Sequence, residues 1–283
     1  MAMSLIQGLG QRGGHKVVLG EPGGITGGEG TIYVRANWAA RPATANDGDY
    51  LHLTNTEATF RWWSGSAGLW DGSGWIRAEI YGRTPVLDKY LTGTVLPAAE
   101  GWTENVGGGG TITSDGTRVR LKGDIAAADL AYISYTHGQT MMWFAADVQA
   151  TFHDANSGLS PDVLITQGAF RVNLMLLGNN SSPIAFFSDN SGSFVGGEQE
   201  RDEDLLTAER MIEIIMSDPV NPAGTAATVD FYADGRGMPA SAKARQSIFP
   251  ADATNRILIG DLTGGVRSNM YIRRALLGHY TTE

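Results

Sequence analysis

Three short stretches near the C-terminus decide the fold: VDFYADG at 229–235, ILIGDLTGG at 257–265 and MYIRRALLG at 270–278. In the first, apolar and polar side chains alternate, which is the period of a β-strand with one buried face. It ends in Asp234-Gly235, a pair that reverses the chain in tight hairpin turns. The second begins with a short, apolar, β-branched run typical of a strand covered on both faces. Together the three stretches predict the strands of a packed β-domain.

Further strands are predicted on the N-terminal side of these stretches. The candidates are AYISYTH (131–137), MMWFAADVQATF (141–152), VLITQGAFRVNLMLLG (163–178), PIAFFSD (183–189) and RMIEIIMSD (210–218). Only DLLTAERMIEIIM (204–216) also fits a helical stripe. Because its second half is rich in isoleucine, we interpret it as a turn or short helix at 203–208 and a strand at 210–217. The chain is therefore predicted to be all-β.

The order of these strands resembles a known family. A strand ending in Asp-Gly, a strand ending in Ile-Gly and a closing strand of the Tyr-Ile-x-x-Ala-Leu type are similar to the C-terminal half of the laminin-G/concanavalin A-like jelly-roll domains. The resemblance implies a jelly-roll sandwich over residues 97–283. It also implies a glycan or protein ligand, because these domains mostly bind one or the other, and some are glycosidases.

The composition narrows the class of partner. The chain has 283 residues, a formal net charge of −9 and no cysteine. A negative protein disfavours nucleic acid and anionic membranes, which attract basic surfaces, so neutral glycans or protein surfaces fit better. The lack of cysteine excludes disulfides and thiolate metal sites. The sequence has no apolar run of about 18 residues, so we expect no insertion into a membrane.

Residues 1–30 are predicted to be a glycine-rich attachment arm. Ten of them are glycine, so the segment has too few side chains to bury a core and needs a surface on which to dock. GLGQRG (8–13) matches the dinucleotide-binding fingerprint, but no strand precedes it, and HKVVLG (15–20) predicts a strand where a helix is needed. The first residues also lack the basic and apolar regions of a signal peptide, so we expect synthesis in a cytoplasm.

Residues 31–85 are predicted to form a small meander of β-hairpins, because short alternating strands are separated by Asp-Gly and Ser-Gly turns. Five of the seven tryptophans lie in this segment: Trp38, Trp62, Trp63, Trp70 and Trp75. They could stack on sugar rings. A domain this small buries little surface alone, however, so we favour a role in its core and in subunit contacts.

The run from GDYLHLT (48–54) to LWDGSGW (69–75) resembles short β modules of bacteriophage fibre and appendage proteins. With a linker at 86–96, the layout is similar to a virion appendage: a phage tail fibre, a head spike, or the head spike fibre of a phage-like gene transfer agent. This resemblance implies a homotrimer held together through residues 1–90 and attachment to other virion proteins through residues 1–85. It also implies that the jelly-roll binds a cell-surface polysaccharide, and that a protein made in the bacterial cytoplasm ends on the particle surface. A purely structural decoration protein is a rival hypothesis.

Strand alternation predicts an open face suited to a sugar. If the strands share one sheet, as in the resembling family, this face carries Trp143, Asp147, Gln149, Arg171, Asn173, Glu213, Asp230 and Tyr232. An aromatic plane among planar polar groups can stack on a sugar ring and bond its hydroxyls. We expect Trp143 at the centre of this contact. The alternative is the ordinary solvated face of a sandwich.

Catalysis and metal binding have less support in the sequence. Asp147, Glu213 and Asp230 could supply the two carboxylates that a glycosidase needs. The E-x-D-x-x-E pattern of many concanavalin-like glycosidases is absent, so a jelly-roll glycosidase or depolymerase stays the alternative to a binding protein. No cofactor is predicted. Calcium could bind loop carboxylates such as Asp189 or Asp261, although the sequence has no D-x-D-x-D-G loop.

Overall fold

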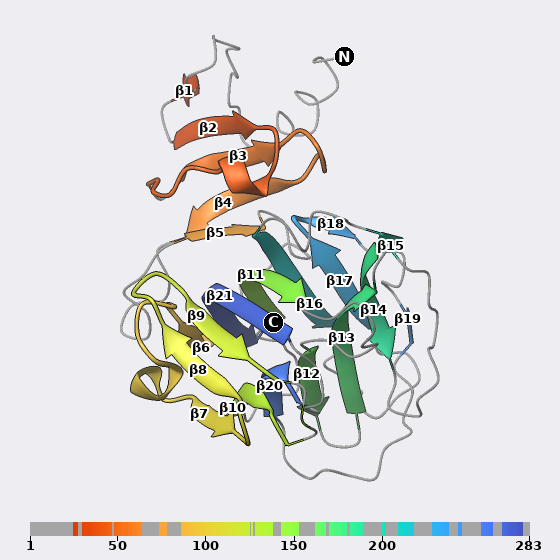
Figure 1. Ribbon diagram of the computed structural model, residues 1–283. Coiled ribbons are helices and arrows are strands. Elements are labelled where there is room, and N and C mark those ends of the chain that lie inside the picture. Colours follow the sequence, from red (N-terminus) through yellow and green to blue (C-terminus); the bar gives the residue numbers. More distant parts are fainter. Residues whose placement is uncertain are drawn as a thin grey trace. The chain divides into compact units, whose positions relative to one another are not determined.

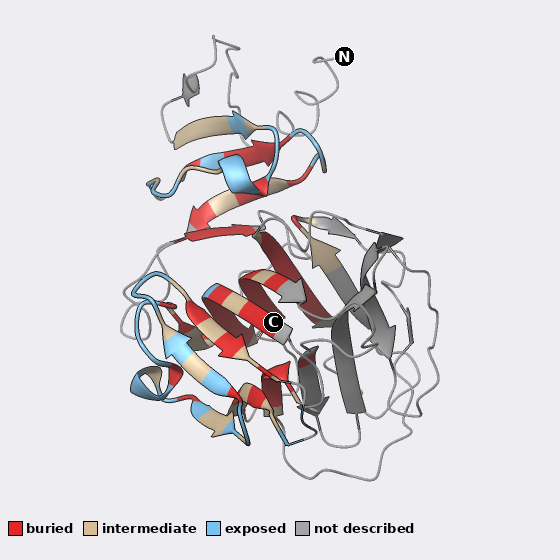
Figure 2. Ribbon diagram, in the orientation of Figure 1, coloured by how far each residue is buried: buried red, intermediate tan, exposed pale blue. Residues whose placement is uncertain are grey.

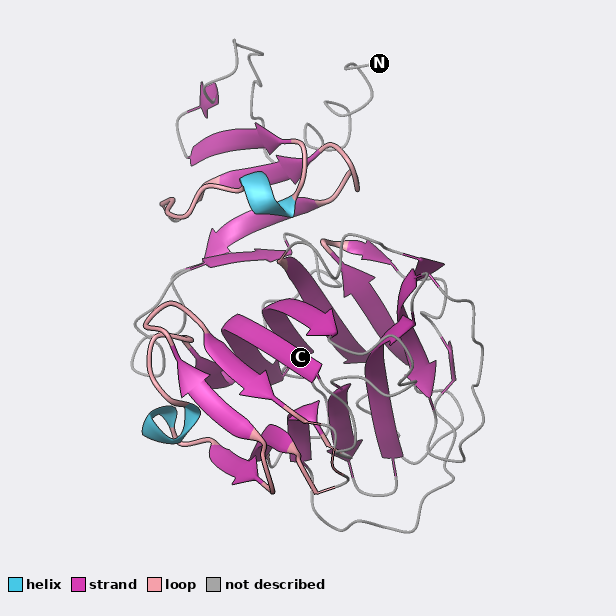
Figure 3. Cartoon of the chain, in the orientation of Figure 1, coloured by secondary structure: helices cyan, strands magenta, loops and turns pink. Residues whose placement is uncertain are grey.

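The computed structural model is built from β-strands, with two short 3-10 helices and no α-helix among the residues that it describes (Figure 3). These residues are 25–27, 30–46, 48–63, 74–77, 86–124, 126, 128–137, 143–152, 162–167, 170–179, 182–188, 200–201, 209–217, 228–237, 243–244, 256–262 and 268–279. Within them, no helix has the length and apolar character needed to cross a membrane. The chain divides into two compact units, Met1–Arg83 with Asp234–Arg236, and Thr84–Ala233 with Gly237–Glu283. The GLGQRG motif lies outside the described residues.

The first unit is a five-stranded sheet in the order β1-β2-β3-β4-β5. Its elements are β1 (Ile25–Gly27), β2 (Gly30–Arg35), the 3-10 helix η1 (Trp38–Ala40), β3 (Tyr50–Leu53), β4 (Thr59–Trp63) and β5 (Gly74–Arg77). The sequence predicts a meander of hairpins, but β2 and β3 run parallel. Parallel neighbours cannot be joined by a tight turn, and the long connection 36–49 provides the crossover instead.

The tryptophans that the structure describes in the first unit belong to its core, as expected. Trp38, Trp62 and Trp75 are 0%, 7% and 2% exposed. The Trp62 and Trp75 rings pack edge to face with centroids 5.1 Å apart, and Nε1 of Trp75 donates to the carbonyl oxygen of Pro42 at 2.8 Å. The indoles are thus buried, and the polar N–H of Trp75 is satisfied. The side chains of Trp63 and Trp70 lie outside the described residues.

The second unit is an antiparallel sandwich of two sheets (Figure 1). The smaller sheet has the order β15-β14-β13-β12-β20-β10-β7. Its strands are β7 (Thr103–Val106), β10 (Ala131–Thr136), β12 (Asp162–Gln167), β13 (Phe170–Asn179), β14 (Ser182–Ser188), β15 (Glu200–Arg201) and β20 (Arg256–Asp261). The 3-10 helix η2 (Pro97–Glu100) comes just before β7.

The larger sheet has the order β18-β17-β16-β11-β21-β9-β8, with β19 paired to β17 and β6 paired to β21. Its strands are β6 (Val86–Leu91), β8 (Thr111–Ser114), β9 (Val119–Lys122), β11 (Trp143–Phe152), β16 (Arg210–Ser217), β17 (Thr228–Ala233), β18 (Arg236–Gly237), β19 (Lys243–Ala244) and β21 (Ser268–His279). In Figure 1, β11, β16 and β21 lie side by side in this layer.

The core of the sandwich is formed by the apolar residues at every second position of its strands. The cluster consists of Leu91, Trp102, Val119, Leu121, Ile133, Phe144, Ala146, Val148, Ala150, Val163, Ile212, Ile214, Ile257, Ile259, Met270, Ile272, Ala275 and Leu277. Figure 2 shows buried residues along β11, β16 and β21. Each apolar Å² removed from water stabilises the fold by about 25 cal/mol, so this face of the larger sheet is a main source of stability.

Several predicted elements can be compared directly with the structure. The strand predicted at 210–217 is confirmed as β16, while residues 203–208 lie outside the described residues. Asp234 and Gly235 have φ angles of 48° and 77°, the positive values that a two-residue type I′ hairpin turn requires. The linker prediction for 86–96 needs correction, because this segment contains β6, and Leu91 of β6 lies in the core.

Candidate carbohydrate-binding face

The larger sheet has a second face, opposite the core, which we call the outer face. Val148 of β11, Ile272 of β21 and Val119 of β9 pair side by side and belong to the core. Because side chains alternate along a strand, their sequence neighbours point to the outer face. One row of paired residues there, which we call the Tyr271 row, consists of Thr113 on β8, Arg120 on β9, Tyr271 on β21 and Gln149 on β11.

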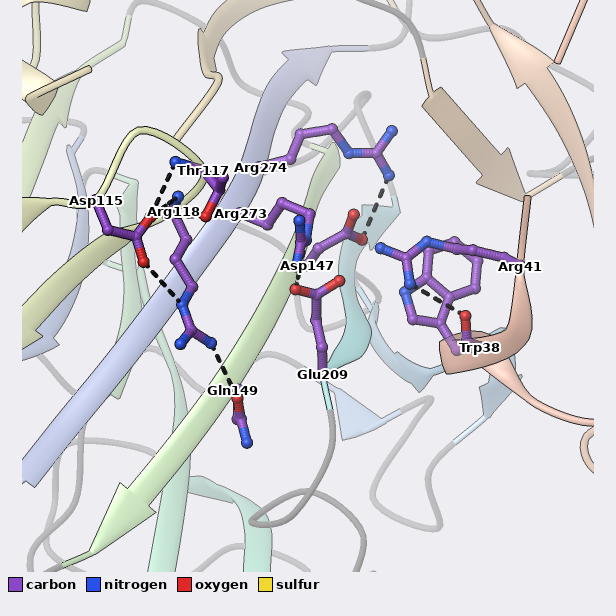
Figure 4. A network of polar contacts seen from close by, with 10 residues as sticks. All are labelled: Trp38, Arg41, Asp115, Thr117, Arg118, Asp147, Gln149, Glu209, Arg273 and Arg274. Atoms are coloured by element: carbon purple, nitrogen blue, oxygen red, sulfur yellow. Dashed lines mark hydrogen bonds and ion pairs between the residues drawn. The ribbon is translucent and has the colours of Figure 1, made fainter. Parts of the chain in front are cut away.

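Two guanidinium groups flank the Tyr271 ring. The Cζ atom of Arg118 lies 4.3 Å from the ring centroid, and that of Arg120 lies 5.8 Å away. Nε of Arg120 donates to Oδ1 of Asn269 at 2.8 Å. Nη1 of Arg118 donates to Oε1 of Gln149 at 3.3 Å (Figure 4). Thr113 is exposed, and the other three residues of the row are half-buried. Aromatic, cationic and amide groups therefore meet on a surface that a ligand can reach.

The turn between β8 and β9 holds Arg118 in place. Oδ1 of Asp115 accepts hydrogen bonds from the hydroxyl of Thr117 at 2.6 Å and from the amides of Thr117 and Arg118, both at 2.9 Å. Its Oδ2 accepts from Nε of Arg118 at 3.3 Å (Figure 4). These hydrogen bonds, above all the one from the Thr117 hydroxyl, hold the pKa of Asp115 well below its usual range. The carboxylate therefore stays ionised and anchors Arg118 beside Tyr271.

A β-bulge brings another arginine to the surface. The register between β11 and β21 shifts so that Arg274 pairs with Asp147 and Ile272 with Val148, and Arg273 is skipped. The Arg273 side chain is 48% exposed, and its Nε donates to Oε2 of Glu209 at 2.7 Å. This hydrogen bond raises the pKa of Arg273. The bulge therefore adds a permanent positive charge on β21, two residues beyond Tyr271.

The part of the outer face around Trp143 is buried, which corrects the prediction of an exposed aromatic centre. Trp143 and Glu213 are both 0% exposed, and Nε1 of the indole donates to Oε1 of Glu213 at 3.2 Å. Asp147 and Arg274 are also buried and form an ion pair of 3.4 Å. Alternation assigned the faces of β11 correctly, since Phe144 is in the core cluster and Trp143 is not. The Trp143 side chain therefore points away from the core and is nevertheless shielded from water.

The predicted site residues do not all share one sheet. Arg171 and Asn173 lie on β13 of the smaller sheet, where they pair with Thr166 and Leu164, so the assumption of a single sheet is wrong for these two. The other six predicted residues lie on strands of the larger sheet: Trp143, Asp147, Gln149, Glu213, Asp230 and Tyr232. The binding role assigned to these residues stays a prediction.

Strand pairing shows how Asp230 and Tyr232 are arranged. Tyr232 on β17 pairs with Glu213 on β16, and Asp230 pairs with Ile215. Glu213 in turn pairs with Ala145 of β11, and Ile215 with Trp143. Tyr232 is half-buried, whereas Glu213 is fully buried. In this part of the outer face, the side chain of Tyr232 is thus more accessible than that of Glu213.

Two acidic side chains of the outer face, those of Asp147 and Glu213, are engaged in structural contacts. Asp147 pairs with Arg274, and Glu213 accepts the Trp143 indole N–H. In the described part of the chain, no group of three or more His, Asp or Glu side chains is arranged to hold a metal ion. Asp261, considered for calcium, is buried at the end of β20, and Asp189 lies outside the described residues.

The arginines beside Tyr271 were not identified from the sequence, although the sequence contains a pattern that indicates them. In TRVRLKGD (117–124), Arg118, Arg120 and Lys122 alternate with Val119 and Leu121. This is the pattern of a strand with one apolar and one basic face. Its significance comes from the pairing of β9 with β21, which puts Arg120 beside Tyr271. Sequence alone does not give that pairing.

Comparison with known proteins finds similarity in structure and none in sequence. No protein-family model matches the chain, and no curated protein matches it. An endo-1,3-beta-glucanase from Streptomyces sioyaensis is similar with a TM-score of 0.47 and 12% identity, over 71% of this chain and 98% of that one. Cellulose induced protein Cip1 is similar with a TM-score of 0.46 and 11% identity, over 62% of this chain and 90% of that one.

A domain solved in a ligand-bound form gives a third example. The exoplasmic/lumenal domain of VIP36, solved in a Ca2+/Man3GlcNAc-bound form, has a TM-score of 0.39 and 13% identity, over 67% of this chain and 89% of that one. With identities of 11–13% and TM-scores of 0.39–0.47, these similarities carry no argument about function, so we argue function from the residues of this chain. The strands themselves define the second unit as a sandwich of two packed antiparallel sheets.

Proposed function

We propose that this protein binds a carbohydrate through the Tyr271 row of its jelly-roll domain. The observation that carries the proposal is the half-buried Tyr271 ring, flanked by the guanidinium groups of Arg118 and Arg120 and aligned with Gln149. A tyrosine ring can stack on the apolar face of a sugar. Guanidinium and amide groups at its edge can bond ring substituents in fixed directions.

The Tyr271 row replaces Trp143 as the centre of the proposed contact. Trp143 is 0% exposed, so a ligand cannot stack on its ring in this conformation. Gln149 belongs both to the face predicted from the sequence and to the Tyr271 row. Among the predicted residues whose side chains the structure describes, Tyr232 on β17 is the other one that is half-buried, and the rest are buried. The site is therefore proposed on the same sheet but toward β9 and β8.

We extend the proposal to the biological setting that the sequence suggests. In it, the protein is a virion appendage, a fibre or head spike, whose residues 1–85 attach to other virion proteins and hold a homotrimer. The jelly-roll then binds the polysaccharide of a host cell surface. The support for this part is the glycine-rich arm and the resemblance of 48–75 to phage appendage modules. Light scattering of the full chain tests it, with a trimer expected and a monomer at micromolar concentration contradicting it.

The binding proposal is tested with the full chain on immobilised polysaccharides. We expect retention without any change in the size of the polysaccharide, because Asp147 and Glu213 are buried in contacts with Arg274 and Trp143. Shortened polysaccharide after incubation would instead identify a glycosidase or depolymerase. Absence of retention on every polysaccharide would contradict the proposal and favour a structural decoration protein.

A further inference from the structure

We infer that the glycan bound by the Tyr271 row is acidic, a polysaccharide that carries carboxylate or sulfate groups. This inference deepens the proposed function and depends on it. It departs from the expectation drawn from composition, because a net charge of −9 points to neutral ligands. The charge around Tyr271 has the opposite sign.

Four cationic side chains gather at this end of the outer face. Arg118, Arg120 and Lys122 alternate along β9 and the residue before it, and Arg273 lies on the bulge of β21. Three of them have a carboxylate partner: Arg118 with Asp115 at 3.3 Å, Lys122 with Asp124 at 3.8 Å, and Arg273 with Glu209 at 2.7 Å. Within the described residues, Arg120 has no such partner. Arg120 is therefore the cation whose charge is left for a ligand.

The Arg120 guanidinium is held in a fixed orientation by neutral groups. Its Nε donates to Oδ1 of Asn269 at 2.8 Å, and Asn269 is itself 0% exposed. The Tyr271 ring lies 5.8 Å from its Cζ atom. Among the described residues, its two terminal nitrogens donate to no acceptor. A planar guanidinium presents parallel donors that match the two oxygens of a carboxylate or sulfate group, so a preorganised fork favours such an anion.

The surroundings favour a glycan over a nucleic acid. The carboxylates of Asp115, Asp124 and Glu209 stand beside the other three cations, so a ligand with a phosphate on every residue meets negative charge around Arg120. A polysaccharide with one carboxylate or sulfate group per repeat can place its anion on Arg120 and its neutral ring on Tyr271. The combination of a cationic guanidinium and an aromatic ring in the Tyr271 row therefore fits a sugar that carries an anionic group.

The test uses the full chain and a matched pair of polysaccharides, polygalacturonate and its fully methyl-esterified form, with alginate, dextran sulfate, neutral dextran and duplex DNA as further probes. We expect retention on at least one acidic polysaccharide and weaker retention on the neutral ones. The difference in retention between acidic and neutral polysaccharides should disappear as added salt shortens the Debye length from about 10 Å at 0.1 M toward 3 Å at 1 M. Arg120→Gln should weaken acidic binding about tenfold. Arg35→Gln is the matched control, because Arg35 also lies over a tyrosine ring, that of Tyr33 at 5.6 Å.

The outcomes separate this inference from the proposed function. Equal retention on polygalacturonate and its ester, or binding to neutral dextran alone, overturns the inference and leaves carbohydrate binding intact. Retention of DNA in preference to every acidic polysaccharide also overturns it. No retention on any polysaccharide overturns both. An unchanged affinity of Arg120→Gln for the acidic polysaccharide, with Arg35→Gln also unchanged, overturns the inference as well, because Arg120 is the cation on which it depends.

Discussion

The indole Nε1 of Trp143 donates a hydrogen bond to Oε1 of Glu213 across neighbouring strands at 3.2 Å, and both residues are 0% exposed. Trp143, which the sequence suggested as the aromatic platform for a sugar, thus donates a hydrogen bond to a buried carboxylate. A buried carboxylate is costly unless it accepts hydrogen bonds, so the pair contributes to stability. It also ties β11 to β16 on the side away from the core.

Trp143→Phe should lower the free energy of unfolding by about 1–3 kcal/mol, because it withdraws a donor from the buried Glu213 carboxylate. Trp102→Phe is the matched control. Trp102 is 3% exposed, and its Nε1 donates to a neutral acceptor, the carbonyl oxygen of Tyr90, at 2.7 Å. Urea unfolding of both variants should show the larger loss for Trp143→Phe. A loss equal to or below that of Trp102→Phe would contradict this account.

Asp147→Asn should destabilise the fold by roughly 3 kcal/mol, because it removes the negative charge from the buried ion pair with Arg274. Glu209→Gln is the control. It removes the shorter but more exposed contact with Arg273, 2.7 Å against 3.4 Å, and should cost less than about 1 kcal/mol. Denaturant titration compares the two. If Glu209→Gln proved the more harmful, burial would not be what decides the strength of these pairs.

The sequence predicts the strands and their faces well because both depend on local features. The alternation in β11 correctly separates Phe144 from Trp143, and Asp234-Gly235 correctly marks a turn with positive φ angles. The sequence does not reveal which sheet a strand joins, or which other residues cover a face of that sheet. Arg171 on β13 has the same local pattern that a strand of the larger sheet would have, yet β13 pairs with β12 and β14. The Tyr271 row was missed for the same reason, since it depends on the pairing of β9 with β21.

Gly260→Ala should be strongly destabilising, because the Ile-Gly strand end needs a residue without a Cβ. Gly260 has a φ of +126°, and a Cβ there would overlap the carbonyl oxygen of Ala131 and lie 2.9 Å from Cδ1 of Leu121. Gly116, at φ +85° with nothing within 4 Å of such a Cβ, is the control and should lose only about 1–2 kcal/mol. Thermal melts of the two variants measure the difference. Equal losses would mean that the backbone angle alone requires the glycine.

The first unit should lose stability as the pH falls below about 6.5. Burial lowers the pKa of His52, an effect that Glu57 only partly opposes. Between the folded and unfolded pKa values the unfolded chain binds more protons, so stability rises with pH across that window and is lost on acidification. Tryptophan fluorescence melts at pH 7.5 and 5.0 should show this loss, and His52→Gln should reduce it. An unchanged pH dependence in the variant would assign the effect to other groups.

The most direct test of carbohydrate binding at the Tyr271 row is the affinity of Tyr271→Ala for a retained polysaccharide, measured by affinity electrophoresis. Tyr50→Ala, which removes a 37% exposed tyrosine from the first unit, is the control. Loss of the ring should weaken binding by about 1–3 kcal/mol, as for other aromatic anchors of binding sites. The control should bind like the unmodified protein. Full retention by Tyr271→Ala would contradict the account, and a loss confined to Tyr50→Ala would move the site to the first unit.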